Sequence, residues 1–182
     1  MGHACQGWAE EQNWDVKLNS LEAIFRALQE AEARYLVVGG VAVIAHGYVR
    51  LTEDLDLVLD LSSDSLRRAL TALQSLGYHP IIPVPILDFA DAELRKDWTE
   101  NRNMKVFNVI SDDYPDVTID IFPKEPFVFA TEYERGEWKD IAPNVRARVV
   151  SVPTLIALKT EANRHRDLDD IDKLRKLHPP VP

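Results

Sequence analysis

Two acidic residues near the middle of the first half of the chain have the type and spacing to hold a divalent metal ion. Asp54 and Asp56 alternate with leucines in a stretch that is expected to form a β-strand, where side chains two residues apart share a face. Two carboxylates on one face repel each other unless they reach water or a cation lies between them. Carboxylate oxygens suit Mg²⁺ and Mn²⁺. We therefore predict that Asp54 and Asp56 are metal ligands; the alternative is a solvated strand end.

A glycine pair stands between an expected strand and an expected helix. The β-branched and aromatic residues 35–38 predict a buried strand, and residues 41–45 predict a short helix that stops at Gly47. Gly39 and Gly40 between them leave backbone N–H groups free at a helix N-terminus, where phosphate binds readily. An anion site beside a metal site suits a metal-bound nucleoside triphosphate. The alternative is a tight strand-to-helix turn, and both interpretations can be true.

The order of these motifs resembles a known family. The similarity begins with three short motifs: Gly39-Gly40, Arg50-x-Thr52 and Asp54-x-Asp56. They resemble the nucleotidyltransferase superfamily that includes DNA polymerase beta, and within it the minimal bacterial enzymes related to the AbiEii toxins. The likeness continues through VTIDIFP around Asp120 and LIALKTEANRHRDLDDIDKL near the C-terminus. Each motif alone is weak evidence, whereas the ordered set is specific.

The resemblance implies a third carboxylate and a reaction. It assigns Asp120, on a strand expected to lie near Asp54 and Asp56, as metal ligand and as acceptor of the proton from an attacking hydroxyl; without it, Asp120 is an outward residue of an alternating strand. The implied enzyme uses Mg²⁺ or Mn²⁺ to transfer a nucleoside monophosphate from an NTP to an acceptor hydroxyl and releases pyrophosphate. No Ser-His or Cys-His nucleophile system is evident, which fits chemistry based on positioning and charge.

Several residues are expected to contact the nucleotide. Gly39 and Gly40 let the backbone approach the triphosphate, and the family likeness adds Arg50 and Lys159 as phosphate contacts, although exposed cations are usually just solvated. The superfamily commonly has Ser after or in place of the second glycine. Here Val41 follows, so one hydroxyl contact is missing unless Thr52 or another group replaces it.

Charged residues near the C-terminus allow more than one interpretation. Arg164, Arg166, Asp167 and Asp170 match a helix junction of the family, yet helix capping and ion pairing explain them at least as well. A local basic patch that could hold an RNA end comprises Arg164, Arg166, Lys173, Arg175 and Lys176. His46, alone beside apolar residues, is expected to be structural, and no Cys/His cluster has zinc spacing.

Composition predicts a soluble, single-domain cytoplasmic protein over residues 1–182. Of its residues 46% are hydrophobic, Cys5 is the single cysteine, and no stretch is apolar enough to cross a membrane. The net charge of −9 disfavours an extended non-specific grip on nucleic acid. Residues 1–17 are expected to form either a loose N-terminal arm or a short packed helix, and residues 152–178 the C-terminal helices.

The periodicity predicts an α/β (α+β) fold, a mixed sheet flanked by helices. Asn19 and Glu22 suggest a capping box at the start of a first helix. This first helix is expected over residues 20–33 and further helices over 66–76 and 88–98. Expected antiparallel hairpins pair residues 104–110 with 117–122 and 137–141 with 145–150. In the last helix, the residues expected to face the core are Leu168, Ile171, Leu174 and Leu177.

Three functions remain open at this point. The first is the nucleotidyltransferase, with RNA such as tRNA, a protein or a small molecule as acceptor, and with the role of a toxin whose partner is an antitoxin protein. The second is a catalytically degenerate module that binds nucleotide or a partner, which Val41 supports. The third is a metal-dependent phosphohydrolase, which explains the acids but not the glycine turn.

Overall fold

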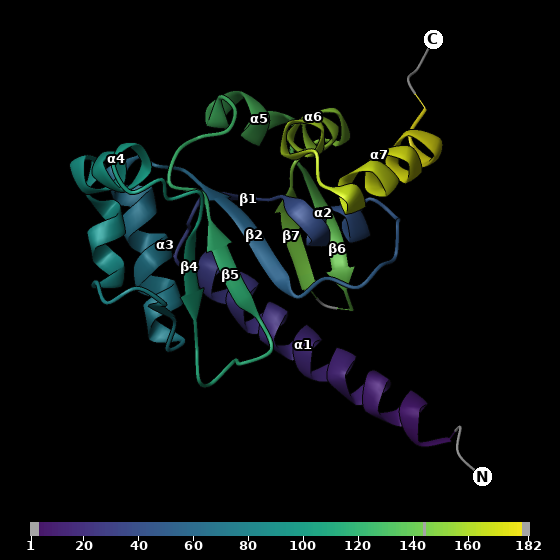
Figure 1. Ribbon diagram of the computed structural model, residues 1–182. Helices are drawn as coiled ribbons and strands as arrows, with labels where there is room; N and C mark the ends of the chain where they lie inside the picture. Colours follow the sequence, from purple (N-terminus) through teal and green to yellow (C-terminus); the bar gives the residue numbers. More distant parts are fainter. Residues whose placement is uncertain (1–3, 144, 180–182) are drawn as a thin grey trace.

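A mixed β-sheet with helices on both sides makes up the molecule (Figure 1). The computed structural model describes residues 4–143 and 145–179. Within these residues the sheet has seven strands in the order β3-β4-β5-β2-β1-β7-β6. The strands are β1 (Tyr35–Val37), β2 (Asp54–Leu59), β3 (His79–Pro80), β4 (Phe107–Ile110), β5 (Thr118–Ile121), β6 (Glu137–Ala142) and β7 (Val145–Val149).

Strand directions agree with the expected mixed sheet. The central β2 pairs antiparallel with β1 and parallel with β5, and β1 pairs parallel with β7. The two predicted hairpins are present as β4–β5 and β6–β7, both antiparallel. Parallel pairing of β2 with β5 brings together residues more than 60 positions apart in the chain, and this pairing builds the site described below.

The helices lie in groups around the sheet (Figure 1). They are α1 (Ala4–Glu30), α2 (Gly39–Ala45), α3 (Ser63–Ser75), the 3₁₀ helix η1 (Ile86–Ala90), α4 (Ala92–Glu100), α5 (Phe129–Arg135), α6 (Val152–Ala162) and α7 (His165–Leu177). α1 contacts α3 and β7, whereas α2 contacts α6, which packs on α7. In the part of the chain that is described, no helix combines the length and apolarity needed to cross a bilayer.

The buried core lies on the leucine face of β2. Leu55, Leu57 and Leu59 are completely buried, and each buried leucine contributes about 1.5–3 kcal/mol to folding. α1 covers this region with apolar residues at helical spacing, and Phe25 stacks on Tyr35 of β1 with ring centroids 5.8 Å apart. The period-two alternation of β2 is thereby confirmed, because its leucines face the core while Asp54 remains exposed.

The first helix is longer than predicted, and the expected capping box is wrong. α1 starts at Ala4, so Asn19 lies inside the helix instead of at its N-cap, and Glu22 pairs with Arg26 one turn later. Residues 8–19 contain neither Gly nor Pro, so nothing in the local sequence breaks the helix there. Residues 4–17 of the expected arm therefore form one continuous helix with the rest of α1; residues 1–3 lie outside the described part.

Two further expectations need correction. The single helix expected over residues 88–98 is divided at Asp91, whose Oδ1 accepts hydrogen bonds from Glu93 N (2.8 Å) and Leu94 N (3.1 Å) and so caps α4. In α7, Leu168 and Leu177 are 58% and 51% exposed.

Two acidic residues, rather than those two leucines, are buried on the inner face of α7. Its buried residues are Asp167, Asp170, Ile171 and Leu174. Their spacing of three, one and three follows the 3.6-residue period of a helix, whereas a strict spacing of three drifts away from the face. Burial of the two acids requires partners, and the structure supplies cations.

Candidate active site

Parallel strands β2 and β5 place the three predicted carboxylates on one face. Their register sets Asp56 opposite Asp120 and Asp54 opposite Thr118. Asp54 is exposed, and Asp56 and Asp120 are partly buried. The structure therefore brings together Asp54, Asp56 and Asp120, which are far apart in the sequence.

Burial and neighbouring carboxylates make both Asp56 and Asp120 harder to ionise. The pKa of Asp56 rises from 3.8 to about 6, chiefly because the group is buried and next because Asp120 is close. Burial also raises the pKa of Asp120, and the charge of Asp54 adds to this effect. Such a pair is the arrangement that a bound cation relieves.

Asn108 of β4 holds Asp120 from the other side. The two residues are opposite each other in the β4–β5 ladder, and the Asn108 Nδ2 donates a hydrogen bond of 2.6 Å to Asp120 Oδ1. This bond favours the charged carboxylate and lowers its pKa against the effect of burial. We did not identify Asn108 from the sequence. A polar residue between the two buried hydrophobic residues of an expected strand was the one available signal.

Both glycines of the turn are required by close side chains. Gly39 has a φ of +62°, and a Cβ added there would lie 1.8 Å from Asp56 Oδ2. A Cβ at Gly40 would lie 2.2 Å from the Thr52 Oγ1. Real atoms never approach this closely, so any side chain would displace the carboxylate or the hydroxyl. The Thr52 hydroxyl thus lies beside the glycine turn, where Val41 has no hydroxyl of its own.

The N-terminus of α2 binds the Asp56 carboxylate through a backbone N–H. The backbone N–H of Gly40 donates a hydrogen bond that partly offsets the raised pKa of this carboxyl. The glycine turn and the metal-ligand candidates are therefore one connected site. A phosphate would share this corner with Asp56.

Arg50 and Lys159 are paired with buried carboxylates. Arg50 holds Asp170 through Nε–Oδ1 (2.9 Å) and Nη2–Oδ2 (3.1 Å) contacts. Lys159 Nζ lies 2.7 Å from Asp170 Oδ2 and 3.1 Å from Asp167 Oδ1. We call these four residues the ionic cluster. Ion pairing, the alternative interpretation of Asp167 and Asp170, is thus present; phosphate contact by Arg50 and Lys159 stays a prediction.

The N-terminus of α6 is held by a side chain from α5, and its C-terminus ends in a left-handed residue. Glu132 of α5, which is buried, accepts hydrogen bonds from Ser151 N and Thr154 Oγ1, both 2.8 Å, and so caps the N-terminus of α6. At its C-terminus Asn163 adopts a left-handed conformation with φ 48°. Lys159 on this helix consequently has a defined position, from which its charge acts on Asp56. The sequence did not point to Glu132.

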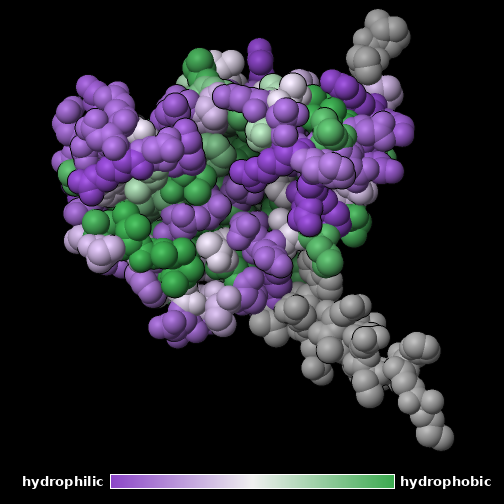
Figure 2. Space-filling view, viewed as in Figure 1, coloured by the Kyte–Doolittle hydropathy of each residue, from purple (hydrophilic) through white to green (hydrophobic). Residues whose placement is uncertain are grey.

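The start of α7 brings a further cation toward the carboxylates. Arg164 is exposed, and its charge lowers the pKa of Asp120 against the effect of burial. Asp167 Oδ2 accepts a hydrogen bond of 3.1 Å from Arg164 N, so the junction also caps the helix. In Figure 2, hydrophilic residues dominate this face where α6 and α7 lie. The RNA-end role of the basic patch stays a prediction.

His46 fits the expected structural role. It is buried, and its Nε2 lies 2.8 Å from the carbonyl oxygen of Val150. His178 approaches it edge-on, with its Nε2 2.8 Å from the His46 carbonyl oxygen. Burial lowers the pKa of His46, which favours a neutral ring.

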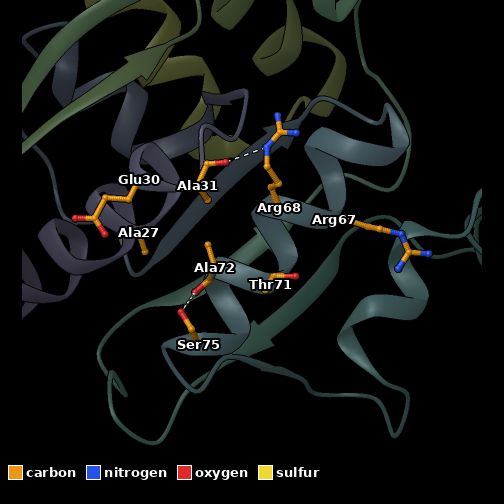
Figure 3. A pocket seen from close by; sticks show the side chains of 8 residues that line it. All are labelled: Ala27, Glu30, Ala31, Arg67, Arg68, Thr71, Ala72 and Ser75. Atoms are coloured by element: carbon orange, nitrogen blue, oxygen red, sulfur yellow. Dashed lines mark hydrogen bonds between the residues drawn. The ribbon is translucent and has the colours of Figure 1, made fainter.

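The described residues contain no group of three or more His, Cys, Asp or Glu side chains already arranged around a metal position. The three carboxylates therefore offer suitable ligands without a finished cage. A cavity of about 490 Å³ lies elsewhere, between α1 and α3 (Figure 3), and Arg68 Nε closes one side through a 2.9 Å hydrogen bond to the Ala31 carbonyl. It includes none of the site residues.

A model of a known family matches most of the chain. Residues 22–181 match the model of the family described as "Nucleotidyl transferase AbiEii toxin, Type IV TA system". The chain belongs to the AbiEii family. The matched region contains the glycine turn, the three carboxylates and the ionic cluster. The expected resemblance is thereby confirmed.

Solved structures share the fold of this AbiEii-family chain. A lincomycin-bound lincosamide antibiotic adenylyltransferase, LnuA, aligns with a TM-score of 0.58 and 15% identity over 88% of this chain and 97% of its own. JHP933 from Helicobacter pylori aligns with a TM-score of 0.53 and 17% identity over 91% of this chain and 67% of its own. At these identities the likeness establishes the fold. No curated protein sequence matches the chain.

Proposed function

We propose that this AbiEii-family chain is a Mg²⁺- or Mn²⁺-dependent nucleotidyltransferase that transfers a nucleoside monophosphate from an NTP to an acceptor hydroxyl. The observation that carries the proposal is the register of β2 and β5, which sets Asp56 against Asp120 beside the glycine turn. The acceptor oxygen would form a bond to the α-phosphorus, the bond to the β-phosphate would break, and pyrophosphate would leave.

The donor set fits a hard divalent cation. Asp54, Asp56 and Asp120 provide carboxylate oxygens on one face, and the raised pKa values of Asp56 and Asp120 reflect charge that the protein alone leaves uncompensated. Mg²⁺ is commonly held by one or two carboxylates, water and substrate phosphates, so an unfinished protein cage is compatible with it. When bound, the ion would offset negative charge on the phosphates.

The chain's own residues have distinct roles in this proposal. Asp120, its pKa raised by burial, would accept the proton of the attacking hydroxyl, and Asn108 would orient it. Thr52 would supply the hydroxyl contact to the triphosphate that Val41 does not. Arg50 and Lys159 would act on the phosphates through their positive charge, from within the ionic cluster.

The proposal is tested with α-labelled NTPs, Mg²⁺, and mixed cellular RNA and protein as acceptors. We expect label on one acceptor class, pyrophosphate release, and loss of both in Asp56→Asn by on the order of a thousandfold or more. Asp112→Asn, on an exposed turn, controls for the loss of one negative charge and should keep activity. EDTA should abolish transfer in the wild type.

Other outcomes separate the remaining functions. Nucleotide binding without transfer would support the degenerate binding module, which Val41 favours and the nearby Thr52 hydroxyl disfavours. Release of free phosphate would identify a phosphohydrolase. The absence of metal-dependent nucleotide binding would refute the site.

We further propose that the activity is that of a toxin held in check by an antitoxin protein, and the support is the family to which the chain belongs. Expression of the wild type, but not of Asp56→Asn, should then arrest bacterial growth. Normal growth in cells that contain active enzyme would contradict this role. The class of labelled acceptor, whether RNA such as tRNA, protein or a small molecule, would name the target.

A further inference from the structure

Helix α1 contacts the chain immediately before Asp54. Lys17 Nζ donates hydrogen bonds to the carbonyl oxygens of Thr52 (2.6 Å) and Glu53 (2.9 Å). These two residues lead directly into β2. Lys17 is 35 residues away in sequence, so this contact is a tertiary one.

The same face of α1 contacts the segment before β5. Ser20, one helical turn after Lys17 and buried, donates a hydrogen bond of 2.8 Å from Oγ to Asp116 Oδ1. Asp116 lies two residues before β5 and four before Asp120. Residues three apart on a helix are neighbours, so Lys17 and Ser20 form one unit, here called the α1 latch.

The segment that the latch holds has little packing of its own. Val49 and Leu51, in the loop before β2, are 79% and 72% exposed. An extended segment without buried apolar side chains depends on its polar contacts for its position. These contacts include Arg50 in the ionic cluster on one side and Lys17 on the other.

Charge strengthens the contact between the latch and both strands. Lys17 is partly buried, which lowers its pKa, while the negative charges of Asp116, Asp54 and Glu53 raise it and so favour the ammonium form. One cation therefore faces the acidic residues at the start of β2 and before β5.

We propose that the α1 latch positions Asp54 relative to Asp120 for nucleotidyl transfer. The latch binds the segments that lead into β2 and β5 to the same helix. The distance between the carboxylates therefore does not depend on the β2–β5 ladder alone. It lies before residue 22, where the match to the AbiEii family begins, so the matched region does not contain it. The effect on transfer rests on the proposed function; the effect on strand position does not.

The test uses the full chain with Lys17→Met, Lys17→Arg and Ser20→Ala. Lys96→Met, an exposed lysine on α4, is the matched control. At saturating NTP we expect Lys17→Met to lower the transfer rate about tenfold or more, because small displacements of catalytic groups have large effects. The KM for NTP should change less than the rate, since Lys17 reaches the substrate only through the backbone of Thr52. Lys17→Arg, which can still donate two hydrogen bonds, should restore most of the rate.

Amide hydrogen exchange tests the latch independently of activity. Exchange over residues 53–56 and 118–120 should be at least about tenfold faster in Lys17→Met than in wild type and Lys96→Met. Unchanged exchange there would overturn the proposal, as would an unchanged transfer rate in an active enzyme. If exchange is faster in Lys17→Met but even the wild type transfers no nucleotide, the latch would be supported and the proposed function refuted. If Lys17→Met lowers the melting temperature and Lys17→Arg does not restore it, Lys17 contributes only to general stability. That result would overturn the positioning role.

Discussion

Two clusters of charge lie close together in this protein and are built in opposite ways. In the carboxylate pair, Asp56 and Asp120, like charges face each other and the surrounding structure compensates them only in part. In the ionic cluster, Asp170 is 1% exposed at its side chain and contacts both Arg50 and Lys159. Among the residues that the structure describes, no cation forms an ion pair with Asp56 or Asp120, whereas Asp170 has two such partners.

The difference separates a ligand site from a scaffold. A buried ion pair is expensive to disturb because removal of one partner leaves the other charge uncompensated. A pair of facing carboxylates instead weakens the apo fold and becomes favourable when a cation arrives. The next three predictions test whether the two clusters differ in this way.

The largest effect on folding is expected in the ionic cluster. Asp170→Ala leaves buried Lys159 with Asp167 as its remaining carboxylate partner and removes the carboxylate that Arg50 contacts, and should lower the free energy of unfolding by about 3–5 kcal/mol. Urea denaturation followed by circular dichroism measures it. Asp172→Ala, which removes an exposed pair with Lys176 on the same helix, should cost far less. Equal losses in the two variants would contradict a scaffold role.

The carboxylate pair should show the opposite sign. The folded pKa of Asp56 is about 6 and its ordinary value is 3.8, so protonated Asp56 stabilises the fold below about pH 4 and this contribution is lost as the pH rises through 6. In EDTA, Asp56→Asn should therefore raise the free energy of unfolding at pH 7.5 by on the order of 2–3 kcal/mol, and by much less at pH 4.

Denaturant titrations at the two pH values measure this difference, with Asp112→Asn as the control. A gain that is the same at both pH values would show that Asp56 is not strained by its ionisation. Mg²⁺ with a nucleotide should remove the advantage of Asp56→Asn, because the ligand binds the wild type and stabilises it.

The smallest effect is expected at the side chain that orients the pair. Asn108→Ala removes the 2.6 Å hydrogen bond to Asp120, raises the pKa of that carboxyl further, and should slow transfer about tenfold. The acid limb of the pH–rate profile should move to higher pH. Gln74→Ala, on the exposed side of α3, is the amide control. A slower rate with an unmoved profile would assign Asn108 a purely structural role.

Local patterns predicted the elements where one period dominates. The alternation of Asp54–Leu59 and the apolar run before Gly39 gave β2 and β1, and the hairpins followed from polar breaks between strand-like runs. Errors arose where tertiary contacts override a local signal. Asn19 resembles a cap only if the helix starts there, and Leu168 resembles a core residue only if acids cannot be buried.

The site divides in the same way. The glycine turn and the three carboxylates have residue types whose chemistry is visible without coordinates, so sequence spacing together with the family resemblance was enough to name them. Asn108, Glu132 and Lys17 have common side chains that gain a role only from what they contact. No spacing rule connects Lys17 with Thr52 or Glu132 with Ser151.

The sequence by itself therefore determined which reactive groups the protein has. These are carboxylates two residues apart, glycines where the backbone lies close to side chains, and the order of motifs typical of the AbiEii family. Tertiary structure decided which carboxylates are paired with cations and which are not. Asp56 and Asp120 meet through parallel pairing of distant strands, while Asp170 turns inward to Arg50 and Lys159. The physical reason is that charge compensation depends on distances of a few ångströms between residues far apart in the chain, and no local pattern encodes these distances.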